Sequence, residues 1–116
     1  MIRPQVLIIG SVWVEPNSSA AGKRMLQLIT QFLERAYEVT FVSAAQKSEK
    51  AFDLVSLGVH ESFIELNHIS FDHFIKKLQP QIVLFDRFIT EEQFGWRIAE
   101  HCPQAIRILD TEDLHC

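Results

Sequence analysis

Residues 6–9, Val-Leu-Ile-Ile, decide the fold of this chain, and Gly10 and Ser11 follow them directly. A short, unbroken apolar run that is rich in β-branched side chains is typical of a strand buried on both faces of a sheet. Residues 82–85, Ile-Val-Leu-Phe, have the same character. We therefore expect these two strands to lie at the centre of a parallel sheet.

Extended and helical patterns alternate on both sides of these two strands. Further strands are expected at residues 39–42, 62–66 and 106–109. Helices are expected at residues 20–36, 48–57, 71–78 and 90–102, with Ser48 and Thr90 as N-caps of the second and the last. Such alternation predicts parallel strands joined by right-handed crossovers. The expected fold is a Rossmann-like, three-layer α/β sandwich of about five parallel strands in the order 3-2-1-4-5, with helices on both faces.

Length and composition indicate one globular domain over residues 1–116. The chain is 47% hydrophobic and 22% charged, which excludes collagen-like, coiled-coil and disordered chains. No repeat or low-complexity linker divides it. Because the chain ends just past the last expected strand, with no helix to cover that side of the sheet, we interpret it as a fragment of a longer protein.

Charge and cysteine content favour a cytoplasmic protein that binds no nucleic acid. Eleven Lys and Arg against fifteen Asp and Glu give a net charge of −4, whereas binding phosphates needs a basic face. Two cysteines outside any CxxC pair indicate reduced thiols. No apolar run approaches the ~20 residues that span a bilayer. Residues 6–14 loosely resemble a secretory signal peptide, but Gly10 and Ser11 interrupt them and Arg3 is the sole positive side chain before them.

The motifs of several cofactor and metal sites are missing. A dinucleotide fingerprint needs closely spaced glycines, but the next glycine after Gly10 is Gly22. Because Gly22-Lys23 is followed by Arg24, there is no P-loop. A phosphorylated receiver domain needs an aspartate after the third strand, where Asn67 stands. With neither HExxH nor GxSxG spacing, we predict no metal, no cofactor and no serine nucleophile.

Polar residues follow the two central strands where a ligand would bind. Ligands of open parallel sheets lie at the carboxyl ends of the strands, near the point where strand order reverses. We therefore expect Gly10, Ser11, Asp86 and Arg87 to line a crevice. The alternative for Asp86 and Arg87 is that they simply pair with each other or with neighbouring residues.

The segment of residues 16–24, Pro-Asn-Ser-Ser-Ala-Ala-Gly-Lys-Arg, is the most distinctive in the chain. Small residues at a helix start leave backbone amides exposed, and the helix dipole favours an anion there. Lys23 and Arg24 add positive charge. The alternative is a mobile connection with an ordinary small-residue helix start. In the preceding loop, Trp13 could stack on a sugar ring or pack down as a lid.

Four stretches together resemble the N-terminal half of the GT-B fold glycosyltransferases, above all the family 4 group. They are Pro16 with Ala21-Gly22 and Lys23-Arg24, residues 37–42 (Tyr-Glu-Val-Thr-Phe-Val), residues 80–86 (Pro-Gln-Ile-Val-Leu-Phe-Asp) and residues 109–115 (Leu-Asp-Thr-Glu-Asp-Leu-His). The sequence departs from the family pattern at Ala21, which replaces a glycine, and at Asp86, where the family often has histidine.

The resemblance implies that the full protein has two domains, which bind different substrates. In enzymes similar to this chain, a second domain holds most of the nucleotide-sugar site, so residues 1–116 would carry chiefly the acceptor half. We expect this piece alone to be inactive or nearly so. Its partners would be a nucleotide-sugar donor and an acceptor of unknown identity.

Acidic residues and a histidine follow the last expected strand. Asp110, Asp113 and His115 are the candidate catalytic residues, because a carboxylate or imidazole there can orient or abstract an acceptor proton. The alternative is that Asp110 caps the following turn and the others are solvated. The residues expected to bind substrate are Gly10, Ser11, Trp13, Gly22, Arg24, Asp86 and Arg87.

Two functions follow from the sequence. The first is the N-terminal, acceptor-side domain of a glycosyltransferase that moves a sugar from a nucleotide-sugar to an acceptor. The second is a Rossmann-like binding or interaction module without catalysis. Because an uncovered last strand can pair with another chain, we also expect a homodimer through that edge.

Overall fold

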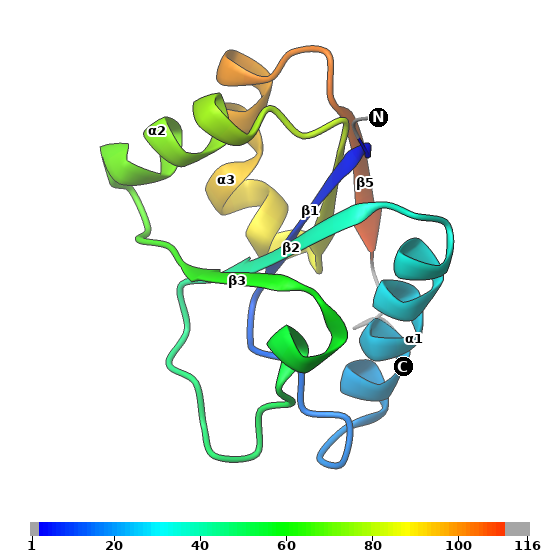
Figure 1. Ribbon diagram of the computed structural model, residues 1–116. Helices are drawn as coiled ribbons and strands as arrows, with labels where there is room; N and C mark the ends of the chain where they lie inside the picture. The colour runs from blue at the N-terminus through cyan, green and yellow to red at the C-terminus, as the bar shows by residue number, and fades with distance from the viewer. Residues whose placement is uncertain (1–2, 111–116) are drawn as a thin grey trace.

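The computed structural model describes residues 3–110 and contains a five-stranded sheet (Figure 1). The strands are β1 (Gln5–Gly10), β2 (Glu38–Ser43), β3 (His60–Phe63), β4 (Ile82–Asp86) and β5 (Ile106–Asp110). Their order across the sheet is β3-β2-β1-β4-β5, and every pairing is parallel. The predicted Rossmann-like topology with strand order 3-2-1-4-5 is therefore confirmed.

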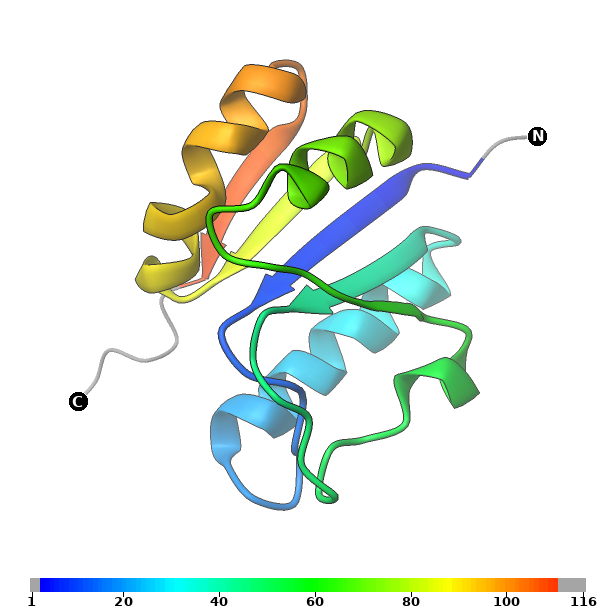
Figure 2. The same cartoon turned by 90° about the vertical axis from the view of Figure 1, so that its left-hand side faces the viewer.

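Helices on both faces of the sheet produce three layers (Figure 2). One face carries α1 (Ala20–Glu34) and the short 3-10 helix η1 (Leu54–Leu57). The other face carries α2 (Ile69–Leu78) and α3 (Phe88–His101). Within residues 3–110, none of the helices combines the length and the apolar character that crossing a bilayer requires.

The central strand β1 is buried because it places apolar side chains on both faces. Val6 and Ile8 belong to the core under α1, whereas Leu7 and Ile9 belong to the core under α2 and α3. All four side chains are 0% exposed. Burying an aliphatic side chain of this size stabilises a fold by roughly 1.5–3 kcal/mol. The apolar run therefore sets the position of β1 in the sheet.

The prediction of a helix over residues 48–57 is wrong, because only the four-residue η1 forms in this stretch. Ser48 caps no helix, and its hydroxyl donates instead to Glu15 Oε2 at 2.5 Å. The Phe52 amide donates to the carbonyl of Val14 at 2.8 Å, so the segment runs along the loop after β1 rather than coiling on itself. Gly58 follows η1 as its C-cap, with a φ of 92° that glycine adopts without strain.

The start of α3 also differs from the prediction. The helix begins at Phe88 with Arg87 as its N-cap, so Thr90 lies inside the first turn. The Thr90 hydroxyl donates to the carbonyls of Asp86 at 3.0 Å and Arg87 at 3.1 Å. Thr90 therefore links the first turn of α3 to the end of β4 by a hydrogen bond, and it is not the N-cap of the helix.

The third strand is shifted toward the N-terminus relative to the expected residues 62–66. β3 pairs His60 with Thr40 and Phe63 with Ser43, which aligns its end with the end of β2. Pairing with β2 thus determines where the strand begins and ends.

Candidate functional site

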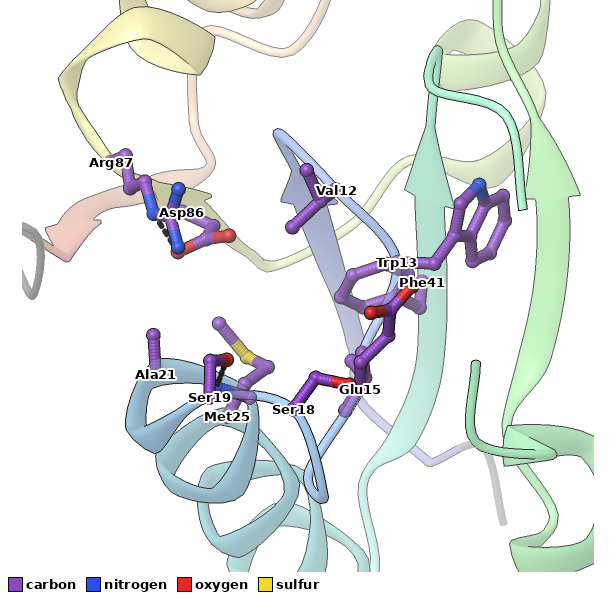
Figure 3. Close-up of a pocket in the computed structure, with 12 residues that line it drawn as sticks. Val12, Trp13, Glu15, Ser18, Ser19, Ala21, Met25, Phe41, Asp86 and Arg87 are labelled. Atoms are coloured by element: carbon purple, nitrogen blue, oxygen red, sulfur yellow. Dashed lines mark hydrogen bonds and ion pairs between the residues drawn. The ribbon is translucent and has the colours of Figure 1, made fainter. Parts of the chain in front are cut away.

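A pocket of about 320 Å³ lies at the carboxyl end of the sheet, between the start of α1 and the ends of β1, β2 and β4 (Figure 3). This is where the strand order reverses, because β2 lies on one side of β1 and β4 on the other. The residues that line the pocket are Val12, Trp13, Val14, Glu15, Ser18, Ser19, Ala21, Gly22, Met25, Phe41, Asp86 and Arg87. The expected crevice therefore exists at the predicted end of the sheet.

The first turn of α1 forms one wall of the pocket. Ser19 is the N-cap, with an extended backbone, and its Oγ accepts a hydrogen bond from the Gly22 amide at 2.9 Å. Gly22 lies so close to the preceding loop that a Cβ atom there would be 2.5 Å from the carbonyl oxygen of Glu15. Glycine is thus required at this position for packing against the loop. The first turn holds no acidic side chain that would oppose a polar ligand at the positive end of the helix dipole.

The end of β4 contributes the charged residues that the sequence places in the crevice. Asp86 is 8% exposed, and its Oδ1 lies 3.9 Å from Arg87 Nε. Arg87 Nε is buried and makes no hydrogen bond within the described part of the chain. Asp86 and Arg87 thus pair with each other and also line the pocket, so the two alternatives for them coexist.

The backbone of Arg87 is strained. Its φ of 76° and ψ of 158° fall in a region that is essentially restricted to glycine. Hydrogen bonds hold this geometry: the Arg87 amide donates to the carbonyl of Asp110 at 2.7 Å, and its carbonyl accepts from Thr90. Strained residues of this kind cluster at functional sites, where they aim a side chain that a relaxed backbone could not place.

Trp13 is packed as a lid rather than presented as an open platform. It is 2% exposed, and its indole N–H donates to the carbonyl of Ala45 at 2.8 Å. Phe41 and Phe63 pack against it, with ring centroids 5.5 Å and 5.0 Å away. Trp13 therefore supplies part of the apolar wall while its ring faces are occupied by the protein.

Gly10 and Ser11 are not among the residues that line the pocket. A Cβ atom on Gly10 would lie 2.4 Å from Phe41 Cζ, so glycine here lets the phenyl ring pack across the end of β1. Ser11 Oγ is buried and makes no hydrogen bond among residues 3–110. The structure thus gives Gly10 a packing role next to the pocket.

Arg24 and Asp110 meet beside the pocket. Arg24 Nη2 lies 3.3 Å from Asp110 Oδ1, which joins α1 to the end of β5. Asp110 is 8% exposed and in register with Asp86 on the neighbouring strand. The other predicted catalytic residues, Asp113 and His115, lie outside the described residues.

Glu15 and Met25 line the pocket although the sequence did not predict them as site residues. Both face the cavity, and Glu15 lies on the opposite side from Asp86 and Arg87 (Figure 3). Met25 is one α-helical turn beyond Ala21, so the amphipathic pattern of α1 hinted at an inward position. No local pattern indicated Glu15, because the loop after β1 has no periodicity.

The lining of the pocket combines apolar side chains with charged and hydroxyl-bearing ones. Its apolar part comes from Trp13, Val14, Met25 and Phe41, and its polar part from Glu15, Ser18, Ser19, Asp86 and Arg87. Within residues 3–110, no group of three or more His, Cys, Asp or Glu side chains is arranged to hold a metal ion. Its volume is at the lower end of the range for small-molecule sites, about 300–1,000 Å³. These features suit a small ligand with both apolar C–H surfaces and several hydroxyl groups.

No protein-family model matches this sequence, and no curated protein or solved structure is significantly similar to it.

Proposed function

We propose that this chain is the N-terminal, acceptor-side domain of a GT-B type glycosyltransferase, and that its pocket binds one sugar ring. The observation that carries the proposal is the pocket itself: it lies at the point of strand reversal, and its lining combines apolar side chains with carboxylates and hydroxyls. The motifs that resemble the family 4 glycosyltransferases support the same function.

The chemistry of a sugar matches this lining. A pyranose ring has an apolar C–H face, which can pack against Val12, a lining residue that is 49% exposed, and against Met25. Its hydroxyls both donate and accept, so they can bond the carboxylates of Glu15 and Asp86 and the guanidinium of Arg87. Because carboxylates line the pocket on opposite sides, hydroxyl donors suit it better than a strongly anionic group.

The proposed catalytic step places the acceptor hydroxyl near the carboxyl ends of β4 and β5. Asp110, or Asp113 or His115 further along the chain, would take the proton of that hydroxyl. The acceptor oxygen forms a bond to the anomeric carbon of the donor sugar as the bond from that carbon to the nucleotide's phosphate breaks, and the nucleotide leaves with the electron pair. A second domain would supply the nucleotide-sugar. In this scheme Arg24 is a positioning residue, since its ion pair holds the Asp110 carboxylate.

Binding of sugars to the chain tests the first part of the proposal. In ¹H–¹⁵N spectra, methyl glucoside, methyl galactoside, methyl mannoside and N-acetylglucosamine should each be titrated to millimolar concentration. At least one sugar should shift the amides of Glu15, Ser19, Gly22 and Arg87 without shifting those of α2. Glu15→Gln and Asp86→Asn should weaken this binding, whereas Glu100→Gln, an exposed change at the far end of α3, should not.

An assay of sugar transfer tests the second part of the proposal, the glycosyltransferase activity. The gene should be sequenced beyond Cys116 and the whole product incubated with common nucleotide-sugars. Donor hydrolysis or transfer would support the glycosyltransferase. Binding to the pocket with complete silence across these donors would instead assign a Rossmann-like binding module, and no binding by any of the four sugars would refute the proposal.

A further inference from the structure

The pocket at the carboxyl end of the sheet carries a carboxylate on each of two opposite sides. Asp86 lies at the end of β4, and Glu15 lies in the loop after β1 (Figure 3). Among the lining residues that the structure describes, Arg87 is the one basic side chain. Two carboxylates against one guanidinium give the lining a net negative charge.

The guanidinium of the lining lies beside Asp86 rather than Glu15. Arg87 Nε is 3.9 Å from Asp86 Oδ1, and the two residues are neighbours where β4 ends. Asp86 is 8% exposed, and a carboxylate removed from water to this degree needs a cation or hydrogen-bond donors beside it. We therefore treat Asp86 and Arg87 as a pair whose charges largely cancel.

Glu15 has no comparable partner. Within residues 3–110, no Lys, Arg or His side chain lies within 4 Å of its carboxylate. Its Oε2 accepts a hydrogen bond from the Ser48 hydroxyl at 2.5 Å, which is a neutral donor. The neighbouring Lys47 pairs instead with Glu61 at 2.6 Å. The described part of the chain thus leaves the charge of Glu15 unpaired at the pocket wall.

An ammonium group on the ligand would satisfy Glu15 better than a hydroxyl group. A hydroxyl offers a single O–H donor, whereas an ammonium offers several N–H donors and a full positive charge. A hydrogen bond between ionised groups is roughly twice as strong as one between neutral groups. The charge distribution of the pocket therefore favours a ligand that is positively charged on the side facing Glu15.

We propose that the sugar bound in this pocket is an amino sugar with a free primary amine, and that Glu15 binds its ammonium group. Asp86 and Arg87 bind hydroxyls on the opposite side of the ring. The free amine distinguishes this ligand from its N-acetylated form, whose amide is neutral. The inference rests on the proposed function, because it assumes that the pocket binds a sugar.

Comparison of glucosamine with glucose and N-acetylglucosamine tests the inference. Each sugar should be titrated into the ¹⁵N-labelled chain at a pH of about 6, where an amine is protonated. The amide shifts of Glu15, Ser19 and Gly22 then give the dissociation constants. Glucosamine should bind roughly threefold to fivefold more tightly than either neutral sugar, as a partly exposed ion pair allows. This preference should decrease as the salt concentration rises.

Two variants separate the Glu15 contact from the overall charge of the chain. Glu15→Gln keeps the size of the side chain and removes its charge, so glucosamine and glucose should bind this variant equally. Glu34→Gln is the matched control, because Glu34 is exposed at the end of α1 away from the pocket. This variant should keep the full preference for glucosamine. Circular dichroism and thermal unfolding confirm that both variants are folded.

A change of pH tests the same contact in the wild-type chain. Raising the pH to about 9 removes the proton from the sugar amine, and the preference for glucosamine should then disappear. The described lining contains no histidine that would titrate over this range. Binding of glucose should therefore stay the same and serve as the reference.

The outcomes distinguish this inference from the proposed function. If the neutral sugars shift the pocket amides and glucosamine binds no more tightly than glucose, the inference is overturned while the proposed function stands. A preference that survives Glu15→Gln, or that Glu34→Gln reduces to the same extent, would also overturn it, because general attraction to an acidic chain would then explain the binding. No binding by any sugar would overturn both.

Discussion

Gly22 and Gly95 both lie in helices, yet the structure predicts opposite effects when each is replaced by alanine. At Gly22 the new Cβ would lie 2.5 Å from the carbonyl oxygen of Glu15 and 2.7 Å from its carbonyl carbon. Both neighbours are backbone atoms, so the loop or the helix must move, at a cost of roughly 1–3 kcal/mol. The helix preference of alanine returns at most about 1 kcal/mol. The difference is a net loss of up to about 2 kcal/mol in the free energy of unfolding.

At Gly95 the nearest atom is the end of a flexible side chain. The new Cβ would lie 2.8 Å from Glu91 Oε2, and the carboxylate can rotate away. The helix preference of alanine then dominates, so Gly95→Ala should raise the free energy of unfolding by about 0.5–1 kcal/mol.

Urea titration and thermal unfolding, both followed by tryptophan fluorescence, measure the two effects. With about 4 °C for each kcal/mol in a domain of this size, Tm should fall by up to about 8 °C for Gly22→Ala and rise by about 2–4 °C for Gly95→Ala. If Gly22→Ala gained stability as Gly95→Ala does, the close approach of the Glu15 backbone to α1 would be refuted. If both variants lost stability equally, the distinction between backbone and flexible neighbours would fail.

Three further predictions concern the strained turn after β4 and the buried thiol. Arg87→Gly should be more stable than Arg87→Ala by about 1–2 kcal/mol, because glycine adopts a φ of 76° without strain and alanine does not. At an ordinary backbone position alanine would be the more stable of the two. Equal urea midpoints for the two variants would show that the backbone of Arg87 is not strained. The Thr90 side chain is 1% exposed, and Thr90→Val removes the hydroxyl that donates to two carbonyls, so this variant should lower the free energy of unfolding by about 1–2 kcal/mol. Thr90→Ser keeps the hydroxyl and should retain most of the wild-type stability. Burial raises the pKa of the Cys102 thiol, so the unfolded chain releases this proton at a lower pH than the folded chain, and stability should fall as pH rises past the usual thiol pKa of about 9. In urea titrations from pH 7 to 10, Cys102→Ala should reduce the slope of the free energy of unfolding against pH. An unchanged slope would show that the thiol contributes nothing to it.

The sheet is the part of this protein that sequence pattern predicts best. The apolar runs at residues 6–9 and 82–85 are buried on both faces, and this alone identified the central strands and the order of the rest. Boundaries were predicted less well where a tertiary contact competes with local preference. Residues 48–57 have a helical pattern, but their backbone bonds the loop after β1, and Thr90 bonds the end of β4 rather than the first turn of α3.

Part of the site followed from the same reasoning. Because parallel strands end at one edge, Asp86 and Arg87 were expected in the crevice, and both line the pocket. The small residues at the start of α1 were likewise expected near a ligand, and Gly22 lies in the pocket wall.

By itself, therefore, the sequence determined which segments are strands, how they are ordered and at which end of the sheet the pocket lies, since these depend on the period of apolar residues along the chain. Only the tertiary structure decided that Glu15 faces Asp86 across the pocket, that Trp13 is covered by other rings, and that Arg24 reaches Asp110, 86 residues away. The strained φ of Arg87 was also decided by the tertiary structure, because hydrogen bonds to Asp110 and Thr90 hold it. Contacts between distant segments depend on how the layers pack, and no local pattern records that packing.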